Sequence, residues 1–422
     1  MTSANLFDLM RASAPALEKA AIEASDGQSL TYGALFERSG RAANALAAIG
    51  VAPGDRVAVQ IDKSPDMIVL LLACLRAGAV LLPLNPAYTM AELEYFLADA
   101  RPALTLCRPA ALETTRALAA RLALPAVESL GAARDGGMAE RIAAAPAEFA
   151  TVPRVADDLA AILYTSGTTG RSKGAMLTHD NLSSNARALI DVWRFTSADV
   201  LIHALPVFHT HGLFTATNVA LLSGATMIFQ PRFDADAIVA ALPRATSLMG
   251  VPTFYVRLAA HEGVTRASTA HIRLFVSGSA PLLAETHEAW RAKTGHAILE
   301  RYGMTETNMI TSNPYEGERR PGTVGFPLPG VRLRIVELRL ADDVLLEELL
   351  AAAEVELRLL EPRLEDFELA RVVDLHPCLR FFGAHEIAHV AQQLQASQRL
   401  AVRTPKFPSL VLKELPPQPG GL

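Results

Sequence analysis

The stretch AILYTSGTTGRSKG, residues 161–174, determines how the rest of the chain is interpreted. An apolar, β-prone run from Leu159 to Tyr164 leads into hydroxyls and glycines, and a second apolar run, 175–177, follows. Glycine permits positive φ and lets backbone N–H groups approach an anion, while hydroxyls and a lysine add donors and charge. The stretch therefore predicts a strand, a phosphate-binding turn and a second strand, with the candidate ligands Thr165, Ser166, Gly167, Thr168, Thr169, Gly170 and Lys173.

The turn does not follow the Walker A pattern. Lys173 lies three residues beyond Gly170, whereas Walker A places its lysine directly after the last glycine. An ordinary polar turn between two strands is the alternative interpretation. The density of donors beside a lysine favours polyphosphate.

Composition limits the possible functions. The chain has 422 residues, half of them apolar and a fifth charged, which is typical of a globular protein with about two to four domains. The net charge is −5 and no run of lysine or arginine exceeds two, so nucleic acid is not expected as a partner.

The chain is also expected to be cytoplasmic and to have no membrane partner. Its three cysteines, Cys74, Cys107 and Cys378, are scattered, which indicates reduced thiols rather than a disulfide framework. No secretory signal is visible at the N-terminus. The most apolar window, 67–84, is interrupted by Arg76 and is too short to span a bilayer. The oligomeric state is left open.

Strand-like and helix-like segments alternate along most of the chain. Thr31 is a predicted helix cap, Ser64-Pro65 a helix start, and Thr89 with Glu92 a capping box. The residues 132–154 are rich in alanine, glycine and proline and are expected to form a surface excursion. The alternation predicts an α/β fold with mainly parallel sheets covered by helices on both faces, with strands at 56–61, 79–82, 103–107, 200–204, 226–229, 247–251 and 274–277 and helices at 181–192, 213–222, 235–242 and 254–260.

Three further polar groups are expected where strands pass into helices, which is where open α/β sheets bind ligands. His209 and His211 lie in the segment 205–212, small residues fill 277–282, and 300–306 combines a cation, an aromatic ring, a hydroxyl and a carboxylate. Each has a plainer alternative: the histidines solvate a turn, the small residues mark close packing, and Glu306 is a surface acid. A carboxylate beside a triphosphate, however, is the usual way to hold Mg²⁺.

Five motifs in register resemble the superfamily of acyl-CoA synthetases, luciferases and peptide-synthetase adenylation domains, and within it most closely the malonyl-CoA synthetases. They lie at 164–174, 205–209, 250–253, 277–282 and 302–306, and the similarity runs from about Leu6 to Val336. The resemblance implies the large N-terminal domain of adenylate-forming enzymes, over residues 1–336. It also implies a ligase that uses ATP and Mg²⁺ to convert a small carboxylic acid to an acyl-adenylate, which CoA then attacks.

The resemblance assigns roles to individual residues. The loop from Thr165 to Lys173 would hold the β- and γ-phosphates, and Thr305 would contact the α-phosphate. Glu306 would hold the Mg²⁺. Adenine would lie against Gly278, Ser279, Ala280 and Tyr302, and the acid would lie near His209, Ser277 and Arg301.

Arg301 decides the expected substrate class. A fatty acyl tail needs an apolar tunnel, in which an unpaired guanidinium would cost several kcal/mol. A dicarboxylic acid instead leaves one carboxylate free to pair with Arg301. Malonate or methylmalonate is therefore expected. The alternative is that Arg301 forms an ion pair with Glu300 or another acid.

The resemblance ends after Val336. The family's ribose-binding aspartate, hinge and C-terminal lysine have no recognisable counterpart, and Lys406 and Lys413 lie outside the family's lysine context. The residues 337–402 are expected to form a helical segment of unknown origin, and 403–422 a disordered tail. His385 and His389 match a zinc motif formally, but no third ligand is evident.

The missing lysine domain predicts impaired turnover. Two alternatives stay open beside a malonate–CoA ligase: a nucleotide- and dicarboxylate-binding remnant with little activity, and a CoA ligase for another small or aryl acid.

Overall fold

The computed structural model describes residues 3–24, 27, 29–165 and 171–333. The chain divides between Leu333 and Arg334, so the described residues all belong to the unit before that point. Residues 166–170, in the predicted phosphate-binding turn, lie outside the described residues. So does the whole of 334–422, with the expected helical segment, His385, His389 and the expected tail. The boundary proposed at 336 stays a prediction.

A six-stranded sheet contains the strand that enters the glycine-rich loop. The order is β6-β5-β3-β4-β7-β8, and every pair is parallel except β7 with β8. The two strands predicted around the loop are therefore confirmed as an antiparallel hairpin. The strands are β3 (Arg56–Gln60), β4 (Val80–Pro83), β5 (Leu104–Cys107), β6 (Val127–Ser129), β7 (Leu159–Thr165) and β8 (Lys173–Thr178).

A nine-stranded sheet contains the other motifs, in the order β15-β14-β13-β12-β11-β9-β10-β1-β2. Its centre, from β13 to β1, is parallel, and β2, β14 and β15 are antiparallel at the edges. The strands are β1 (Ala20–Ala24), β2 (Ser29–Thr31), β9 (Val200–His203), β10 (Thr226–Phe229), β11 (Ser247–Gly250), β12 (Leu274–Ser277), β13 (Leu299–Met304), β14 (Asn308–Ser312) and β15 (Phe326–Pro327).

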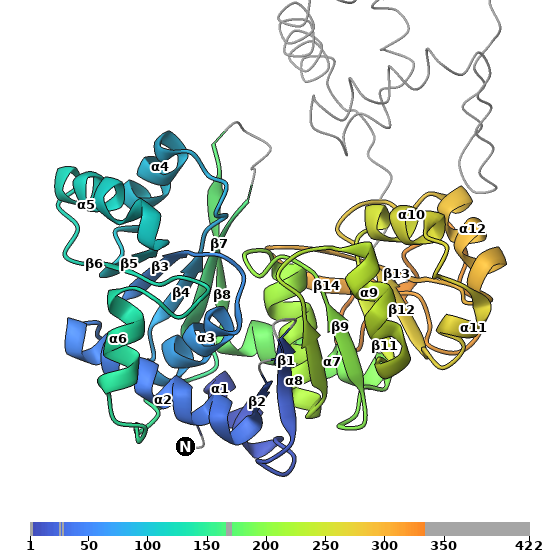
Figure 1. The fold of residues 1–422 in the computed structure, drawn as a ribbon, viewed down its shortest axis with the longest axis horizontal. Coiled ribbons are helices and arrows are strands. Elements are labelled where there is room, and N and C mark those ends of the chain that lie inside the picture. Colours follow the sequence, from blue (N-terminus) through green and yellow to red (C-terminus); the bar gives the residue numbers. More distant parts are fainter. Residues whose placement is uncertain (1–2, 25–26, 28, 166–170, 334–422) are drawn as a thin grey trace, which may run out of the picture. The chain divides into compact units, whose positions relative to one another are not determined.

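Helices pack against both sheets (Figure 1). The central strands β4, β5, β10, β11 and β12 are buried over their whole length, as expected for parallel strands covered on both faces. The α/β prediction is confirmed. The helices are α1 (Leu6–Ala12), α2 (Tyr32–Ile49), α3 (Pro65–Ala77), α4 (Met90–Ala100), α5 (Leu112–Arg121), α6 (Gly137–Ala144), α7 (His179–Trp193), α8 (Thr217–Ser223), α9 (Ala235–Ala241), α10 (Pro252–Ala260), α11 (Arg266–Thr269) and α12 (Ala284–Thr294), with short turns η1 (Pro109–Ala111), η2 (His211–Ala216) and η3 (Leu242–Arg244).

Local capping behaves largely as the sequence predicts. Thr31 caps α2 by accepting from Ala34 N, and Thr89 and Glu92 form the predicted capping box at α4. Ser64 does occupy the N-cap position of α3, but its side chain makes no capping hydrogen bond. The proline at the first helical position sets the backbone angle there without that bond.

Three local predictions need correction. The segment 132–154 contains the helix α6, whose inner face buries Met138 and Ile142. The helix expected at 213–222 begins earlier, as the π-helical turn η2, and continues as α8. The motif 300–306 lies on β13 and the turn into the antiparallel strand β14, not at a strand-to-helix junction. Its polar residues reflect a hairpin turn, which the short motif alone does not distinguish from a helix start.

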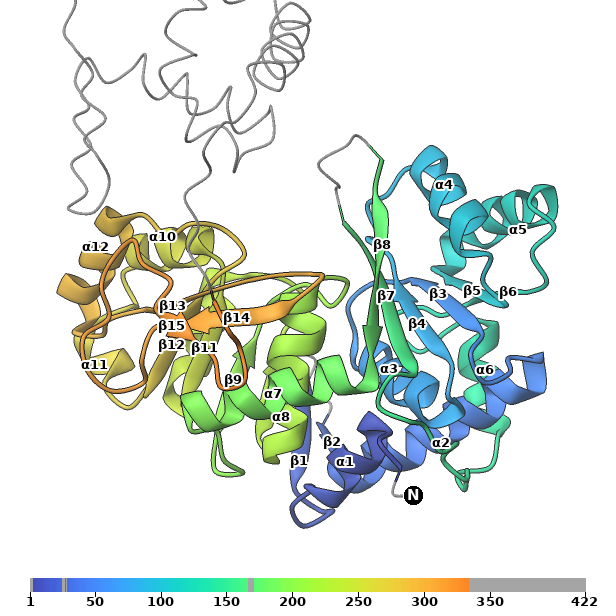
Figure 2. The same cartoon turned by 180° about the vertical axis from the view of Figure 1, so that it is seen from behind.

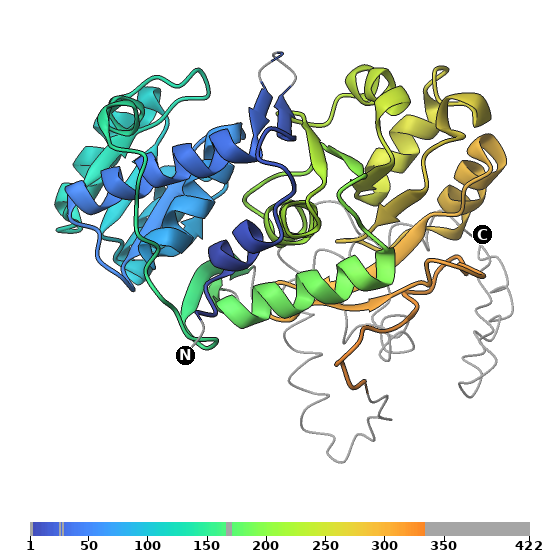
Figure 3. The ribbon, with the colours of Figure 1, turned by 90° about the horizontal axis from the view of Figure 1, so that it is seen from below.

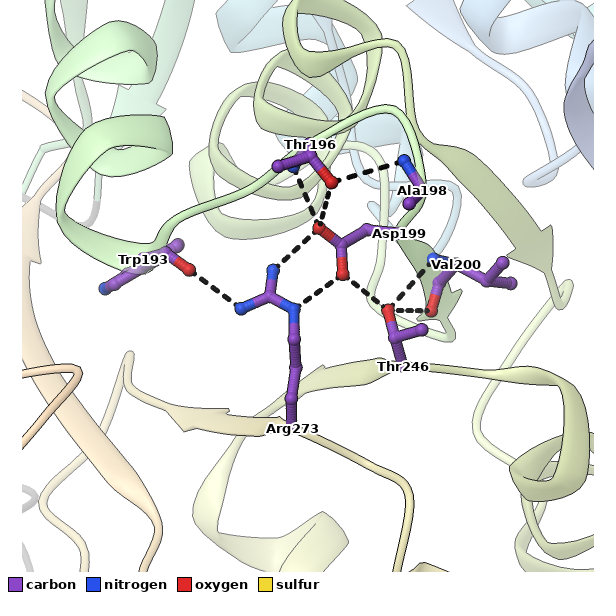
Figure 4. Close-up of polar contacts among 7 residues, drawn as sticks. All are labelled: Trp193, Thr196, Ala198, Asp199, Val200, Thr246 and Arg273. Carbon is purple, nitrogen blue, oxygen red and sulfur yellow. Dashed lines mark hydrogen bonds and ion pairs between the residues drawn. The ribbon is translucent and has the colours of Figure 1, made fainter.

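An ion pair between a half-buried arginine and a buried carboxylate holds the amino-terminal ends of the parallel strands together (Figure 4). Arg273, just before β12, donates through Nε and Nη2 to Asp199, just before β9, at 2.6 and 2.8 Å. Thr246, just before β11, donates to the same carboxylate at 2.7 Å. Burial would raise the pKa of Asp199, but the hydrogen bonds from Arg273 and Thr246 outweigh it and hold that pKa below its usual value.

The helix α7 runs along the strand β14, the second strand from one edge of the nine-stranded sheet (Figures 2 and 3). Asn185 donates from Nδ2 to the carbonyl of Met309 at 2.7 Å and accepts from Met309 N at 3.3 Å. This pair of hydrogen bonds fixes the start of β14 and so the turn that carries Thr305 and Glu306. Among the described residues, no helix is long and apolar enough to cross a membrane.

Candidate active site

The motifs of the nine-stranded sheet meet at the carboxyl ends of neighbouring strands. The strands β9, β11, β12 and β13 are adjacent and parallel. The segments 205–212 and 278–282 follow β9 and β12, and 301–306 covers the end of β13 and the turn after it. This edge is where open α/β sheets bind ligands.

The glycine-rich hairpin is held at its base by aromatic side chains. Thr165 and Lys173 are paired across β7 and β8, directly before and three residues after the loop 166–170. Tyr95, on α4, donates its hydroxyl to the carbonyl of Ser172 at 2.6 Å, and Tyr164 donates to Asp99. Lys173 is exposed and forms no ion pair within the described part of the chain. Phosphate binding here stays a prediction.

Arg301 is a buried cation that forms no ion pair with any carboxylate of the described residues. It is 2% exposed, and its Nε and Nη2 atoms have no hydrogen-bond partner among the described residues. The neighbouring carboxylate of Glu300 accepts from Leu282 N at 2.9 Å instead. The alternative of an Arg301–Glu300 ion pair is therefore wrong. Burial lowers the pKa of Arg301 to about 9, against a smaller opposing effect of Tyr255.

Gly278 shapes the space around this guanidinium. A β-carbon at position 278 would lie 2.4 Å from Cζ of Arg301 and 2.6 Å from its Nε. Any side chain at 278 would therefore have to displace Arg301. The glycine brings the predicted adenine slot into direct contact with the predicted acid-binding residue.

His211 links two of the loops. It is buried, and its Nδ1 lies 3.1 Å from Ser279 Oγ. Ser279 has a left-handed backbone with φ of 70°, a conformation that costs energy for a residue other than glycine. Burial first, and then the charge of Arg301, hold the pKa of His211 well below its ordinary value, so the imidazole is neutral beside the cation.

His209 lies in the loop between β9 and the π-helical turn η2, whereas His211 is the first residue of that turn. The side chain of His209 is exposed and its ring centroid lies 4.5 Å from that of Phe208. Its carbonyl accepts from Leu213 N at 2.9 Å. The next residue, Thr210, donates to Asn308 Oδ1 at 3.2 Å, which ties this loop to the turn between β13 and β14.

The end of β13 and the turn after it present three more of the predicted residues. Tyr302 is 43% exposed, Thr305 is half-buried and Glu306 is exposed. Gly303 is required because a β-carbon there would lie 2.1 Å from the carbonyl oxygen of Asn308. No cluster of three or more metal-ligating side chains occurs in the described ranges. Glu306 could therefore hold Mg²⁺ only together with other oxygens, such as those of a phosphate chain.

A cavity of about 480 Å³ lies beside these loops. It opens among residues that follow β3, β4, β9 and β10, and Phe208, next to His209, forms part of its wall. Most of the lining is apolar, and the charged exceptions are Asp62, Lys63 and Arg232. The sequence motifs did not single out Lys63 or its neighbour His203. Their only sequence signal is their position at the carboxyl end of a strand.

Comparison with known proteins places this architecture in a family. The family model described as AMP-binding enzyme matches residues 10–343. The mitochondrial malonate–CoA ligase of Bos taurus is 36% identical over 328 residues, which cover 72% of this chain and 55% of that protein. A feruloyl-CoA synthase of Amycolatopsis is 38% identical over 307 residues, covering 71% and 60%.

Solved structures agree with the sequence comparison. The ATP-bound MatB of Rhodopseudomonas palustris superposes with a TM-score of 0.76 at 56% identity, and the match covers 78% of this chain and 65% of that one. The chain thus spans a little over half the length of the curated relatives it matches. The residues matched by the family model include all five motifs between 164 and 306, and this chain belongs to the AMP-binding enzyme family.

Proposed function

We propose that this chain activates malonate or methylmalonate with ATP and passes the acyl group to CoA. The observation that carries the proposal is the buried guanidinium of Arg301, which has free hydrogen-bonding atoms and no carboxylate partner among the described residues. A buried, unpaired cation is costly. A substrate that brings its own second carboxylate would remove that cost, whereas a monocarboxylic acid would not.

The reaction has two steps. An oxygen of one malonate carboxylate attacks the α-phosphorus of ATP, and the bond from that phosphorus to the bridging oxygen breaks, which releases pyrophosphate. The sulfur of CoA then attacks the acyl carbon, its proton is lost, and AMP leaves. Positioning and charge stabilisation supply most of the rate in such reactions.

The described residues fit distinct parts of this task. Arg301 would pair with the carboxylate that does not react, while His209 and Ser277 would border the one that does. Gly278, Ser279, Ala280 and Tyr302 would lie against adenine, since glycine and alanine at a strand end leave room for a flat ring. Thr305 would donate to the α-phosphate, and Thr165 and Lys173 would hold the β- and γ-phosphates together with the loop 166–170.

Glu306 fits the role of a single protein ligand to nucleotide-bound Mg²⁺. Its carboxylate is exposed and forms no ion pair with any described residue. Mg²⁺ usually keeps waters and phosphate oxygens and takes only one or two carboxylates from the protein. The bound ion would neutralise charge on the phosphates during adenylation.

Two relatives support different acids. The malonate–CoA ligase match supports a dicarboxylate, and the slightly higher identity to a feruloyl-CoA synthase supports an aryl acid as the second candidate. Arg301 favours the dicarboxylate, because ferulate has no second carboxylate to pair with it. The impaired turnover and the location in the cytoplasm that the sequence leads us to expect stay predictions.

The acid can be identified by calorimetry with the full chain saturated with an inert ATP analogue and Mg²⁺. Malonate and methylmalonate are expected to bind at least about tenfold more tightly than acetate, a difference of about 1.4 kcal/mol. Tighter binding of ferulate than of malonate would show that the substrate is an aryl acid and not a dicarboxylate. Equal, weak binding of all four acids would contradict the proposal.

A further inference from the structure

We propose that Lys63 and His203 form a positioning pair that holds the turn carrying His209 and His211 in its working geometry. Both residues lie outside the predicted site, and neither is assigned a contact with substrate. Lys63 follows β3 in the six-stranded sheet, and His203 ends β9 in the nine-stranded sheet. Their contact therefore joins the two sheets beside the cavity. The inference rests on the proposed function only for the claim that this geometry serves acid binding.

His203 contacts the π-helical turn at the carbonyl oxygen of Gly212. This oxygen accepts a hydrogen bond from Thr217 N, and that bond closes the π-helical turn η2. It also accepts from Thr217 Oγ1 at 2.9 Å. His203 Nε2 lies 2.9 Å from the same oxygen. Nε2 also lies 3.3 Å from Thr217 Oγ1, but a carbonyl oxygen can only accept, so the shorter contact to Gly212 assigns the imidazole proton to Nε2. His203 is thus a third donor to the residue that directly follows His211.

Lys63 fixes this tautomer. With the proton on Nε2, the other ring nitrogen of His203 is an acceptor. Lys63 Nζ lies 3.1 Å from that Nδ1 atom and also donates to the carbonyl of His203 at 2.8 Å. The same amino group lies 4.3 Å from the centroid of the Phe229 ring. The opposite tautomer would place two donors against each other at Nδ1, and it would remove the hydrogen bond from His203 to the Gly212 carbonyl.

The surroundings favour a neutral imidazole. Burial lowers the pKa of His203 to about 3, and the charge of Lys63 adds to the effect. No carboxylate lies within ion-pair distance of Lys63 in the described ranges, since its neighbour Asp62 pairs with Arg108 instead. The polar partners of Lys63 are therefore the ring and the backbone carbonyl of His203. A structural salt bridge would instead include a carboxylate.

The held turn has little freedom to adjust. A β-carbon at Gly212 would lie 2.0 Å from the carbonyl oxygen of Pro206, so the chain doubles back tightly between 206 and 212. His211 in turn contacts Ser279, and burial beside Arg301 keeps it neutral. A shift of the Gly212 carbonyl would therefore move both histidines relative to Arg301 and Ser279.

Lys63→Met, His203→Gln and the double variant test the pair in the full chain. Methionine keeps the length and apolar stem of Lys63 but removes its donors. Glutamine can place an amide N–H near the position of Nε2 and so keep the bond to Gly212 without help from Lys63. Lys293→Met is the matched control, because Lys293 also donates to two backbone carbonyls, at 2.7 and 2.8 Å, far along the chain on α12.

The first measurement needs no ligand. In ¹⁵N-histidine NMR spectra, wild type is expected to show His203 as the neutral Nε2–H tautomer. Lys63→Met is expected to shift the signals of His203, His209 and His211, and Lys293→Met to leave all three in place. Unshifted signals of His209 and His211 in Lys63→Met would overturn the positioning claim, whatever the protein's substrate.

The second measurement is binding. Lys63→Met should weaken malonate binding by about tenfold while the affinity for ATP changes by less than about twofold. In the His203→Gln background the same lysine change should alter malonate binding by less than about twofold, because coupled residues are non-additive. Equal losses of ATP and malonate affinity, or additive losses in the double variant, would overturn it. If wild type binds no malonate but the NMR shifts occur, the proposed substrate fails and the pair stands.

Discussion

The guanidinium of Arg301 lies against the α-carbon of Gly278, so closely that a β-carbon there would come within 2.4 Å of Arg301 Cζ. Pairing of β12 with β13 brings the two residues together, since Ser277 lies opposite Glu300. The predicted adenine slot and the predicted acid pocket therefore share one wall. A substitution that alters the adenine slot should therefore also alter the affinity for the acid.

Gly278→Ala tests this shared wall. The added methyl must push the buried guanidinium aside, so malonate affinity should fall by about tenfold or more. Overpacking should also lower the free energy of unfolding by about 1–3 kcal/mol. Calorimetry and thermal unfolding measure the two effects. A Gly278→Ala protein with wild-type malonate affinity would refute the contact.

Arg301→Met should abolish the discrimination between malonate and acetate. Loss of hydrogen bonds to a charged carboxylate costs about 1.5–3 kcal/mol, so malonate should bind roughly 10- to 100-fold more weakly. Without ligand, the melting temperature should stay the same or rise, because the variant no longer buries an unpaired charge. Undiminished preference for malonate would show that Arg301 does not pair with the acid.

Arg273→Met is the contrasting arginine variant. Arg273 is paired with the buried carboxylate of Asp199 (Figure 4). Its removal should leave that carboxylate uncompensated and lower the free energy of unfolding by about 3–5 kcal/mol. The ratio of malonate to acetate affinity should not change, since the pair lies at the amino-terminal ends of the strands. Urea unfolding and calorimetry separate these effects, and a changed affinity ratio would contradict the assignment.

His179 should make stability depend on pH. Burial lowers the pKa of His179 to about 4, whereas an unfolded histidine has a pKa of about 6.5. Between these values the unfolded state binds more protons, so stability is complete above pH 6.5 and falls as the pH drops toward 4. The loss attributable to His179 should be on the order of 2–3 kcal/mol.

His179→Asn isolates this effect. In wild type, His179 Nδ1 accepts a hydrogen bond from Leu6 N at 3.0 Å. Asparagine cannot titrate, but its side-chain oxygen can still accept that hydrogen bond. Urea unfolding at several pH values between 7 and 5 should show a shallower loss of stability in the variant than in wild type. Parallel curves would mean that His179 does not titrate in this range.

Glu306→Gln should weaken binding of MgATP by about tenfold and raise the Mg²⁺ concentration needed for it, since the neutral amide is a poorer ligand for a hard cation. AMP binding without Mg²⁺ should be unchanged. Glu316→Gln is a suitable control, because Glu316 is also exposed but pairs with Arg194 at 2.6 Å. Equal Mg²⁺ dependence in the Glu306 variant and in wild type would exclude the carboxylate as a ligand.

Local chemistry made much of the fold predictable. The capping box at Thr89, the alternation of strands and helices, and the hairpin around the glycine-rich loop depend on residues close in sequence. The position of the turn after β13 was misjudged because a polar motif of seven residues fits a hairpin as well as a helix start. The π-helical turn at His211 depends on Thr217 and Gly212 and has no simple periodic signature.

The site needed contacts that no local pattern contains. Gly278 and Arg301 meet through strand order, and Lys63 meets His203 across 140 positions of sequence and between two sheets. That Arg301 has no carboxylate partner among the described residues also depends on where Glu300 points, toward Leu282 N. Sequence motifs identified the candidate residues, and tertiary packing decided which of them touch.

Malonate-dependent exchange of labelled pyrophosphate into ATP, measured with the full chain and Mg²⁺, tests adenylation most directly. Exchange requires reversible formation of the acyl-adenylate and does not require CoA. The expected result is exchange well above a control without malonate, with little stimulation by acetate and with loss of the malonate effect in Arg301→Met. Measurable ATP binding without any malonate-dependent exchange would contradict the proposed activity and would leave a binding module.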